Sequence, residues 1–83
     1  MYKVQLTARA KRELKKISKR HKVAIASMVE ELMDNPFIGK FLTRDLSGKY
    51  SLRVGVYRII YTVNKNDKVV HVLTAGHRST VYN

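Results

Sequence analysis

The sequence predicts a single two-layer α+β domain, and three features of the chain support this fold class. A short segment of alternating apolar and polar residues opens the chain, two segments with the apolar spacing of helices follow, and three alternating segments close it. The chain has 83 residues, enough for one small core but not for a second domain. We therefore expect residues 1–83 to form one domain, in which a two-helix hairpin covers one face of an antiparallel β-meander and the N-terminal strand joins the sheet.

The first elements are predicted to be a short strand and a basic helix. Residues 2–6 alternate in polarity as a strand does, and Thr7 is suited to cap the helix that follows. This helix is predicted to begin at Ala8. Its narrow apolar stripe consists of Ala10, Leu14 and Ile17. One side of the helix therefore packs on the core, and basic residues cover the rest.

A second helix is predicted from a longer apolar stripe. The stripe consists of Ile25, Met28, Val29 and Leu32, which follow helical spacing. Asn35 and Pro36 end the pattern, because proline lacks an N–H group and cannot continue a helix. The joint between the two helices is placed at residues 18–22. No glycine marks that turn, so a single bent helix is the alternative to a hairpin.

The last part of the chain is predicted to be three antiparallel strands. They are residues 50–54, 56–63 and 69–75. A turn at Gly55 and another at residues 64–68 join them. Residues 37–49 contain two glycines and are predicted to be a loop whose few apolar side chains lie on the core.

The chain is strongly basic, and the charge is concentrated near its start. Lysine and arginine number 17 against 6 acidic residues, which gives a formal charge of +11. Such a charge favours phosphate-bearing partners, and nucleic acid above all. Residues 1–22 hold nine of the basic side chains but only one acid. The predicted RNA-binding residues of this segment are Lys11, Arg12, Lys15, Lys16 and Lys19.

Composition also limits the cellular compartment in which we expect the protein and the kinds of chemical site that it can contain. The chain has no cysteine, which excludes disulfides, zinc–thiolate sites and thiol nucleophiles and is what a reducing compartment permits. No apolar segment is long enough to span a bilayer or has the form of a signal peptide. The histidines lie on separate predicted elements without metal-ligand spacing, and no cofactor-binding motif is present. We expect a cytoplasmic protein without a membrane partner, a metal or a cofactor.

Two arginines of the predicted sheet form a candidate phosphate site. Alternation places Arg53 and Arg58 on the face away from the helices, and the tight connection at Gly55 makes them near neighbours. Two adjacent guanidinium groups repel each other unless an anion lies between them. The pair therefore indicates a phosphate site, although each arginine taken singly is also explained as a solvated strand residue.

The end of the chain adds groups that suit RNA cleavage. His77, Arg78 and Tyr82 lie within six positions of one another. Attack of a 2′-hydroxyl on its own phosphodiester needs a proton acceptor, positive charge on the phosphorane and a proton donor to the departing oxygen. Arginine supplies charge only, so His77 and Tyr82 are the titrating candidates. A polar strand end for His77, and base stacking or packing for Tyr82, are the alternatives.

Two segments of the sequence carry a family resemblance. Residues 50–61 read YSLRVGVYRIIY, and Gly76-His77-Arg78 and Val81-Tyr82 follow them. Together these motifs resemble the RelE family of toxins from bacterial and archaeal toxin–antitoxin pairs, and the resemblance covers essentially the full length. It implies the RelE-like fold and a metal-independent, ribosome-dependent endoribonuclease. Such an enzyme enters the decoding site and cuts messenger RNA by 2′-hydroxyl attack, leaving a cyclic phosphate.

The resemblance implies roles for three residues. Arg58 matches the phosphate-binding arginine of the family. Arg78 matches the arginine that supports the charge of the transition state and the leaving group. Tyr82 matches the C-terminal tyrosine that stacks on the substrate base and orients it.

Two further positions concern the proton acceptor. Arg53 falls where family members carry a basic residue, often lysine. Ser51 departs from the family pattern, which has another basic residue at this position. Neither serine nor arginine accepts a proton easily, so the proton acceptor of this chain is open, and His77 is one candidate.

Two other functions stay open beside RNA cleavage. A ParE-type toxin resembles this fold but poisons DNA gyrase without cutting RNA. A non-catalytic basic module that binds nucleic acid or the ribosome is the other alternative, because Ser51 replaces a basic residue. For a RelE toxin, the resemblance implies the ribosome and messenger RNA as partners. It also implies a cognate antitoxin whose apolar, acid-bearing helix neutralises the basic surface.

Overall fold

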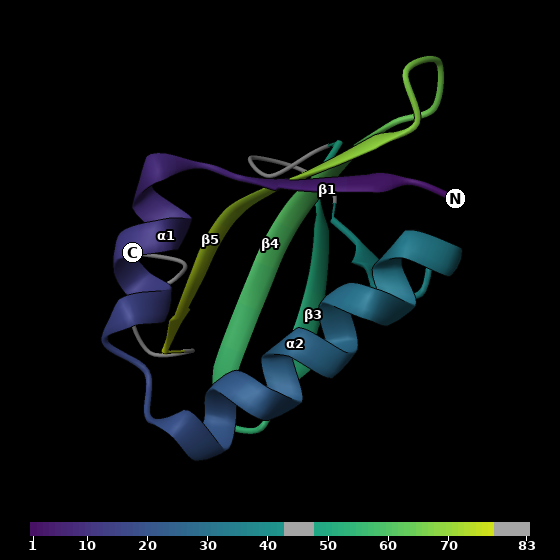
Figure 1. Ribbon diagram of the computed structural model, residues 1–83. Coiled ribbons are helices and arrows are strands. Elements are labelled where there is room, and N and C mark those ends of the chain that lie inside the picture. Colours follow the sequence, from purple (N-terminus) through teal and green to yellow (C-terminus); the bar gives the residue numbers. More distant parts are fainter. Residues whose placement is uncertain (43–47, 78–83) are drawn as a thin grey trace.

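The computed structural model describes residues 1–42 and 48–77. In chain order the elements are β1 (Lys3–Leu6), α1 (Ala8–Lys15), α2 (Lys19–Asp34), β2 (Lys40–Phe41), β3 (Tyr50–Val54), β4 (Tyr57–Asn64) and β5 (Val69–His77). The strands form one sheet in the order β1-β5-β4-β3-β2, in which β1 runs parallel to β5 and all other neighbours are antiparallel. Two helices on one mixed sheet confirm the predicted α+β class, and the first strand joins the sheet as expected (Figure 1).

The two helices are separate and follow the predicted boundaries closely. Thr7 caps α1, because its Oγ1 accepts a hydrogen bond from a backbone N–H group of the first turn at 3.1 Å. α2 ends directly before the Asn35-Pro36 pair, as predicted. The joint comprises residues 16–18 and begins two residues earlier than predicted, and this break contradicts the single bent helix. Neither described helix combines the length and apolar character needed to cross a membrane.

Beyond the end of β1, side chains of α1 and of its cap residue form hydrogen bonds to the edge of β5. Figure 1 shows α1 beside β5, and α2 crossing the sheet in front of β3 and β4. Thr7 Oγ1 donates a hydrogen bond to the Leu73 carbonyl at 2.8 Å. Glu13 Oε1 accepts hydrogen bonds from Thr74 Oγ1 at 2.6 Å and from the Ala75 N–H group at 3.2 Å. The one acid of the basic segment therefore satisfies backbone and side-chain donors at a sheet edge.

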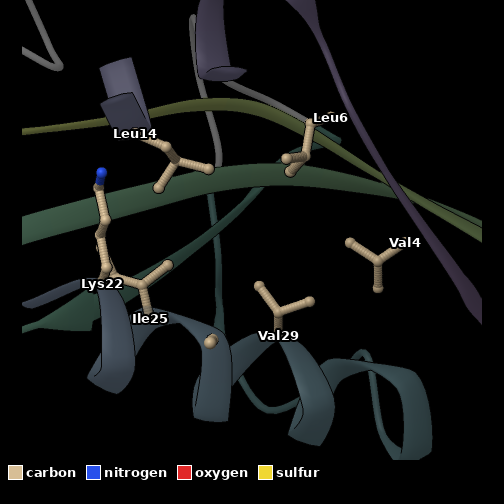
Figure 2. Close-up of a pocket in the computed structure, with 7 residues that line it drawn as sticks. Val4, Leu6, Leu14, Lys22, Ile25 and Val29 are labelled. Atoms are coloured by element: carbon tan, nitrogen blue, oxygen red, sulfur yellow. The ribbon is translucent and has the colours of Figure 1, made fainter. Parts of the chain in front are cut away.

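An apolar cavity of about 340 Å³ lies between α2 on one side and α1 and β1 on the other. Figure 2 shows its labelled lining residues, which are Val4, Leu6, Leu14, Lys22, Ile25 and Val29. Among the lining residues that the structure describes, Lys22 alone is charged. The N–H group of Tyr2 donates to the Met33 carbonyl at 2.8 Å, which ties the start of β1 to the end of α2. The helical layer thus retains an apolar hollow beside a lysine.

The segment predicted to be a continuous loop contains the edge strand β2, so that prediction is wrong in part. Lys40 pairs with Ser51, and Phe41 pairs with Tyr50. Two residues are too few to show an alternation of polarity, which is why the sequence pattern does not reveal this strand. Pairing with β3 extends the sheet by one strand beyond the predicted meander.

The core residue Tyr61 fixes the approach to β2. It is fully buried, with 0% of its surface exposed. Its hydroxyl donates a hydrogen bond to the Pro36 carbonyl at 2.9 Å and accepts one from the Gly39 N–H group at 3.0 Å. Its ring stacks on Tyr50, with ring centroids 5.4 Å apart. Because these contacts lie directly before β2, they hold that strand against β3.

The buried hydroxyl of Tyr61 predicts a loss of stability at alkaline pH. Burial raises the pKa of Tyr61 above its ordinary value of 10.0, and outweighs the hydrogen bond from Gly39, which acts in the opposite direction. The folded state therefore holds this proton more tightly than the unfolded chain, so the free energy of unfolding falls as pH rises above about 10. We expect Tyr61→Phe to show a shallower fall. Urea unfolding at a series of alkaline pH values measures how steeply the free energy of unfolding falls with pH in each protein, and Tyr2→Phe is the control. Equal slopes for Tyr61→Phe and wild type would contradict this prediction.

Candidate active site

Two arginines lie opposite each other on the sheet face away from the helices. Arg53 on β3 pairs with Arg58 on β4, which confirms the neighbourhood predicted by counting across Gly55. Their chain neighbours Val54 and Ile59 belong to the core under the helices, so alternation directs both arginines to the other face. The fold therefore brings two guanidinium groups together on one surface.

Arg58 is oriented by a neighbouring serine. The Nη1 atom of Arg58 donates a hydrogen bond to Ser51 Oγ at 3.2 Å. Ser51 is only 5% exposed and lies two residues before Arg53, on the same face of β3. Arg58 is half-buried, whereas Arg53 is exposed. Of the two arginines, Arg58 is consequently the better positioned to bind a ligand in a fixed geometry.

The strand register arranges this face as two rows that run across the sheet. The first, which we call the arginine row, consists of Arg53, Arg58 and Gly76. The second, the serine row, consists of Lys40, Ser51, Ile60 and Thr74. Neither row contains an acidic residue, and three of their side chains are cationic. The carboxylate of Glu13 contacts the serine row at Thr74, the end of the row away from Lys40. The two rows therefore form a site suited to an anion.

The arginine row can stabilise charge but cannot transfer protons. A guanidinium presents several N–H donors in a planar fork that matches the oxygens of a phosphate group. It keeps its proton throughout the physiological pH range, so it serves neither as a general base nor as an ordinary general acid. Reaction at this row consequently needs a titrating group from elsewhere on the same face.

The structure places His77 on the face of the sheet opposite to the arginine row. A bulge in β5, at which the register skips Leu73, reverses the alternation of that strand. His77 consequently pairs with Tyr57 on the helix-facing side, where the two ring centroids lie 6.1 Å apart. Gly76 takes the position beside Arg58. The imidazole of His77 is therefore separated from the arginine row by the sheet.

The other predicted site residues fall into two groups. Arg78 and Tyr82 lie outside the described residues. The predicted RNA-binding residues are all exposed, and they are Lys11, Arg12 and Lys15 on α1, Lys16 in the joint and Lys19 at the start of α2. This exposure agrees with a charged surface, and the binding of RNA by it stays a prediction.

One cation of the site has no counterpart in the sequence analysis. Lys40 lies on β2 directly opposite Ser51, which places it in the serine row. In the sequence it is one of two lysines in an apparent loop, and only the pairing of β2 with β3 brings it to this face. No sequence signal short of that pairing identifies it.

Comparison with known proteins identifies the family. A family model described as the ParE toxin of the type II toxin–antitoxin system parDE matches residues 4–82. Toxin RelG of Mycobacterium tuberculosis is 35% identical, over 98% of this chain and 95% of that protein. Toxin RelE of the same organism is 34% identical, over 98% of this chain and 86% of that protein.

The fold agrees with these relationships. In the crystal structure of the toxin–antitoxin complex RelBE2 from M. tuberculosis, one chain matches this protein with a TM-score of 0.86 and 34% sequence identity. The match covers 93% of this chain and 98% of that chain. These findings confirm the resemblance of the sequence motifs, and the chain belongs to the RelE family of toxins, within the RelE/ParE superfamily of type II toxin–antitoxin systems.

Proposed function

We propose that this toxin is a ribosome-dependent endoribonuclease, which cuts messenger RNA by attack of a 2′-hydroxyl on the adjacent phosphodiester and needs no metal ion. The observation that carries the proposal is the arginine row, in which Arg58 is oriented by Ser51 and lies opposite Arg53. The paired strands β3 and β4 carry two cationic side chains and no acidic one, and this positive charge suits the negative charge that forms during phosphodiester cleavage.

Arg58 is the residue that binds the scissile phosphate in this proposal. As the 2′-oxygen bonds to phosphorus, negative charge grows on the non-bridging oxygens of the phosphorane. Arg58 donates hydrogen bonds to these oxygens from the orientation that Ser51 gives it, and the exposed Arg53 adds a second positive charge. A donor that is oriented beforehand stabilises the transition state more than the ground state, because little reorganisation is needed.

The end of the chain completes the proposed site. By the family resemblance, Arg78 supports the charge on the phosphate and the leaving 5′-oxygen, and Tyr82 stacks on the base beside the scissile bond. Gly76 stands beside Arg58 in the arginine row and precedes Arg78 by two residues in the chain.

Charge and relatives support two kinds of partner. The formal charge of +11 and the exposed cations of α1 favour the ribosome and its message. The related M. tuberculosis toxin was solved in a complex with its antitoxin, and we infer that a cognate antitoxin neutralises this chain too. We infer that apolar side chains of such an antitoxin helix enter the hollow of Figure 2 and that an acidic residue of the helix pairs with Lys22 in its lining.

Primer extension on a defined message tests the proposal. Ribosomes programmed with that message are incubated with the purified toxin, and the same message without ribosomes is the control. We expect shortened message with a cut inside the codon at the decoding site, and intact message when ribosomes are absent.

The same protein preparation separates the alternatives. The ParE description of the matching family model keeps gyrase poisoning as the second candidate function. Loss of gyrase supercoiling together with an intact message would favour that function and contradict RNA cleavage. An intact message with normal supercoiling would instead indicate a binding module without catalysis.

A further inference from the structure

We propose that Lys40 accepts the proton of the attacking 2′-hydroxyl, an inference that rests on the proposed function and assigns its missing base. Attack needs a group on the arginine-row face that can take up a proton. The guanidinium groups of Arg53 and Arg58 cannot do so, and His77 lies on the helix-facing side of the sheet. The hydroxyl of Ser51 already accepts a hydrogen bond from Arg58.

Strand pairing places Lys40 next to this reaction site. Lys40 lies directly opposite Ser51 on the neighbouring strand, and residues so paired have Cβ atoms about 4.5–5.5 Å apart. Ser51 in turn contacts the guanidinium of Arg58 at 3.2 Å. Ser51 therefore lies between the backbone of the lysine and the guanidinium. In this proposal the long lysine side chain extends past Ser51 toward a phosphodiester held at Arg58.

The backbone of Lys40 is fixed although its side chain is exposed. On one side, the preceding residue Gly39 is fixed, because its N–H group donates a hydrogen bond to the Tyr61 hydroxyl at 3.0 Å. On the other side, the ring of Phe41 packs against Tyr50, with centroids 5.1 Å apart. In the described part of the chain, no carboxylate lies within ion-pair distance of Lys40. The amine is thus available to a ligand and starts from a defined position.

The charged groups that the structure describes around Lys40 on this face are cations. The arginines of β3 and β4 are the nearest cations in the arginine row. Lys49 and Arg53 each lie two residues from Ser51, the residue opposite Lys40, whereas His71 lies farther along the sheet, since it pairs with Thr62, four residues beyond Arg58.

The proposed step balances in bonds and protons. The 2′-oxygen forms a bond to phosphorus while the bond from phosphorus to the 5′-oxygen breaks, which leaves a 2′,3′-cyclic phosphate. The Nζ atom of Lys40 takes the 2′-hydroxyl proton and later returns it to solvent. The departing 5′-oxygen takes up a proton from water, so no oxidant, reductant or further reactant is involved.

Variants of Lys40 test the assignment in single-turnover cleavage on programmed ribosomes. Lys40→Arg keeps the positive charge but removes the accessible base, and Lys40→Ala removes both. We expect each to slow cleavage by about 100-fold or more. Added methylamine should partly restore Lys40→Ala but not Lys40→Arg. Lys65→Arg and Lys65→Ala, in the exposed turn before β5, are the matched controls and should cut like wild type.

The outcomes distinguish this inference from the function on which it rests. If wild type cuts the message and Lys40→Arg cuts it at the same rate, Lys40 supplies charge only and the inference is overturned. If Lys40→Ala is slow but amines do not restore it, the lysine acts structurally and the inference is also overturned. A wild-type protein that cuts no message overturns the proposed function, and this assignment with it. Thermal unfolding of each variant confirms that the fold is retained.

Discussion

Replacement of Arg58 by alanine is expected to slow message cleavage on programmed ribosomes by about 100- to 1,000-fold, the usual effect of removing one oriented donor from a developing negative charge. Arg58 combines partial burial with a hydrogen bond to Ser51, so its guanidinium has a defined position. Arg58→Lys should recover only part of the rate, because an ammonium lacks the planar fork that binds two phosphate oxygens. Single-turnover rates at saturating toxin measure this loss.

A matched variant separates the effect of the site from the effect of total charge. Arg20 is an exposed arginine near the start of α2. Arg20→Ala therefore removes one positive charge, as Arg58→Ala does, but at a position outside the arginine row. We expect Arg20→Ala to cut at nearly the wild-type rate. Equal rates for Arg58→Ala and Arg20→Ala would show that Arg58 does not hold the phosphate.

Gly39→Ala is expected to lower the free energy of unfolding by about 2–3 kcal/mol, because it overfills a tight contact and disturbs buried hydrogen bonds. A Cβ atom at this position would clash with the hydroxyl of Tyr61 and lie 3.0 Å from the Ser51 carbonyl. Relief requires a shift of Tyr61 or of β2. A shift of Tyr61 breaks its hydrogen bond to the Pro36 carbonyl, and a shift of β2 displaces Lys40 from Ser51.

Gly48→Ala is the matched control for this loss of stability. At Gly48 an added Cβ meets no atom of the described residues within 4 Å, although the positive φ of 85° imposes a backbone cost of about 1 kcal/mol. Urea unfolding of both variants gives the comparison. A Gly39→Ala protein as stable as Gly48→Ala would contradict the packing described around Tyr61.

The arginine pair was predictable because long strands carry a clear signal. β3 and β4 each contain enough residues to show alternation, and the short turn at Gly55 sets their register, so Arg53 meets Arg58 as predicted. The helix limits were predictable from local chemistry as well. Thr7 offers a side-chain cap and Pro36 cannot continue a helix.

The positions of His77 and Lys40 could not be predicted, for two different physical reasons. Uninterrupted alternation from His71 would put His77 on the face of Arg58. The bulge at Leu73 shifts the register by one residue, so each later side chain of β5 lies on the opposite face. Lys40 lies on a two-residue strand that exists only through its pairing with β3. In both cases the decisive information is contact between strands, which local sequence patterns do not contain.

The most direct test of message cleavage by 2′-hydroxyl attack is a single-atom change in the substrate. A message with one 2′-deoxynucleotide immediately before the scissile phosphate lacks the proposed nucleophile at that bond only. On programmed ribosomes, wild-type toxin should cut the all-ribose message to a 2′,3′-cyclic phosphate and leave the substituted bond intact. Cutting at the substituted bond at the same rate would show that the nucleophile is not the 2′-hydroxyl, and would contradict the account.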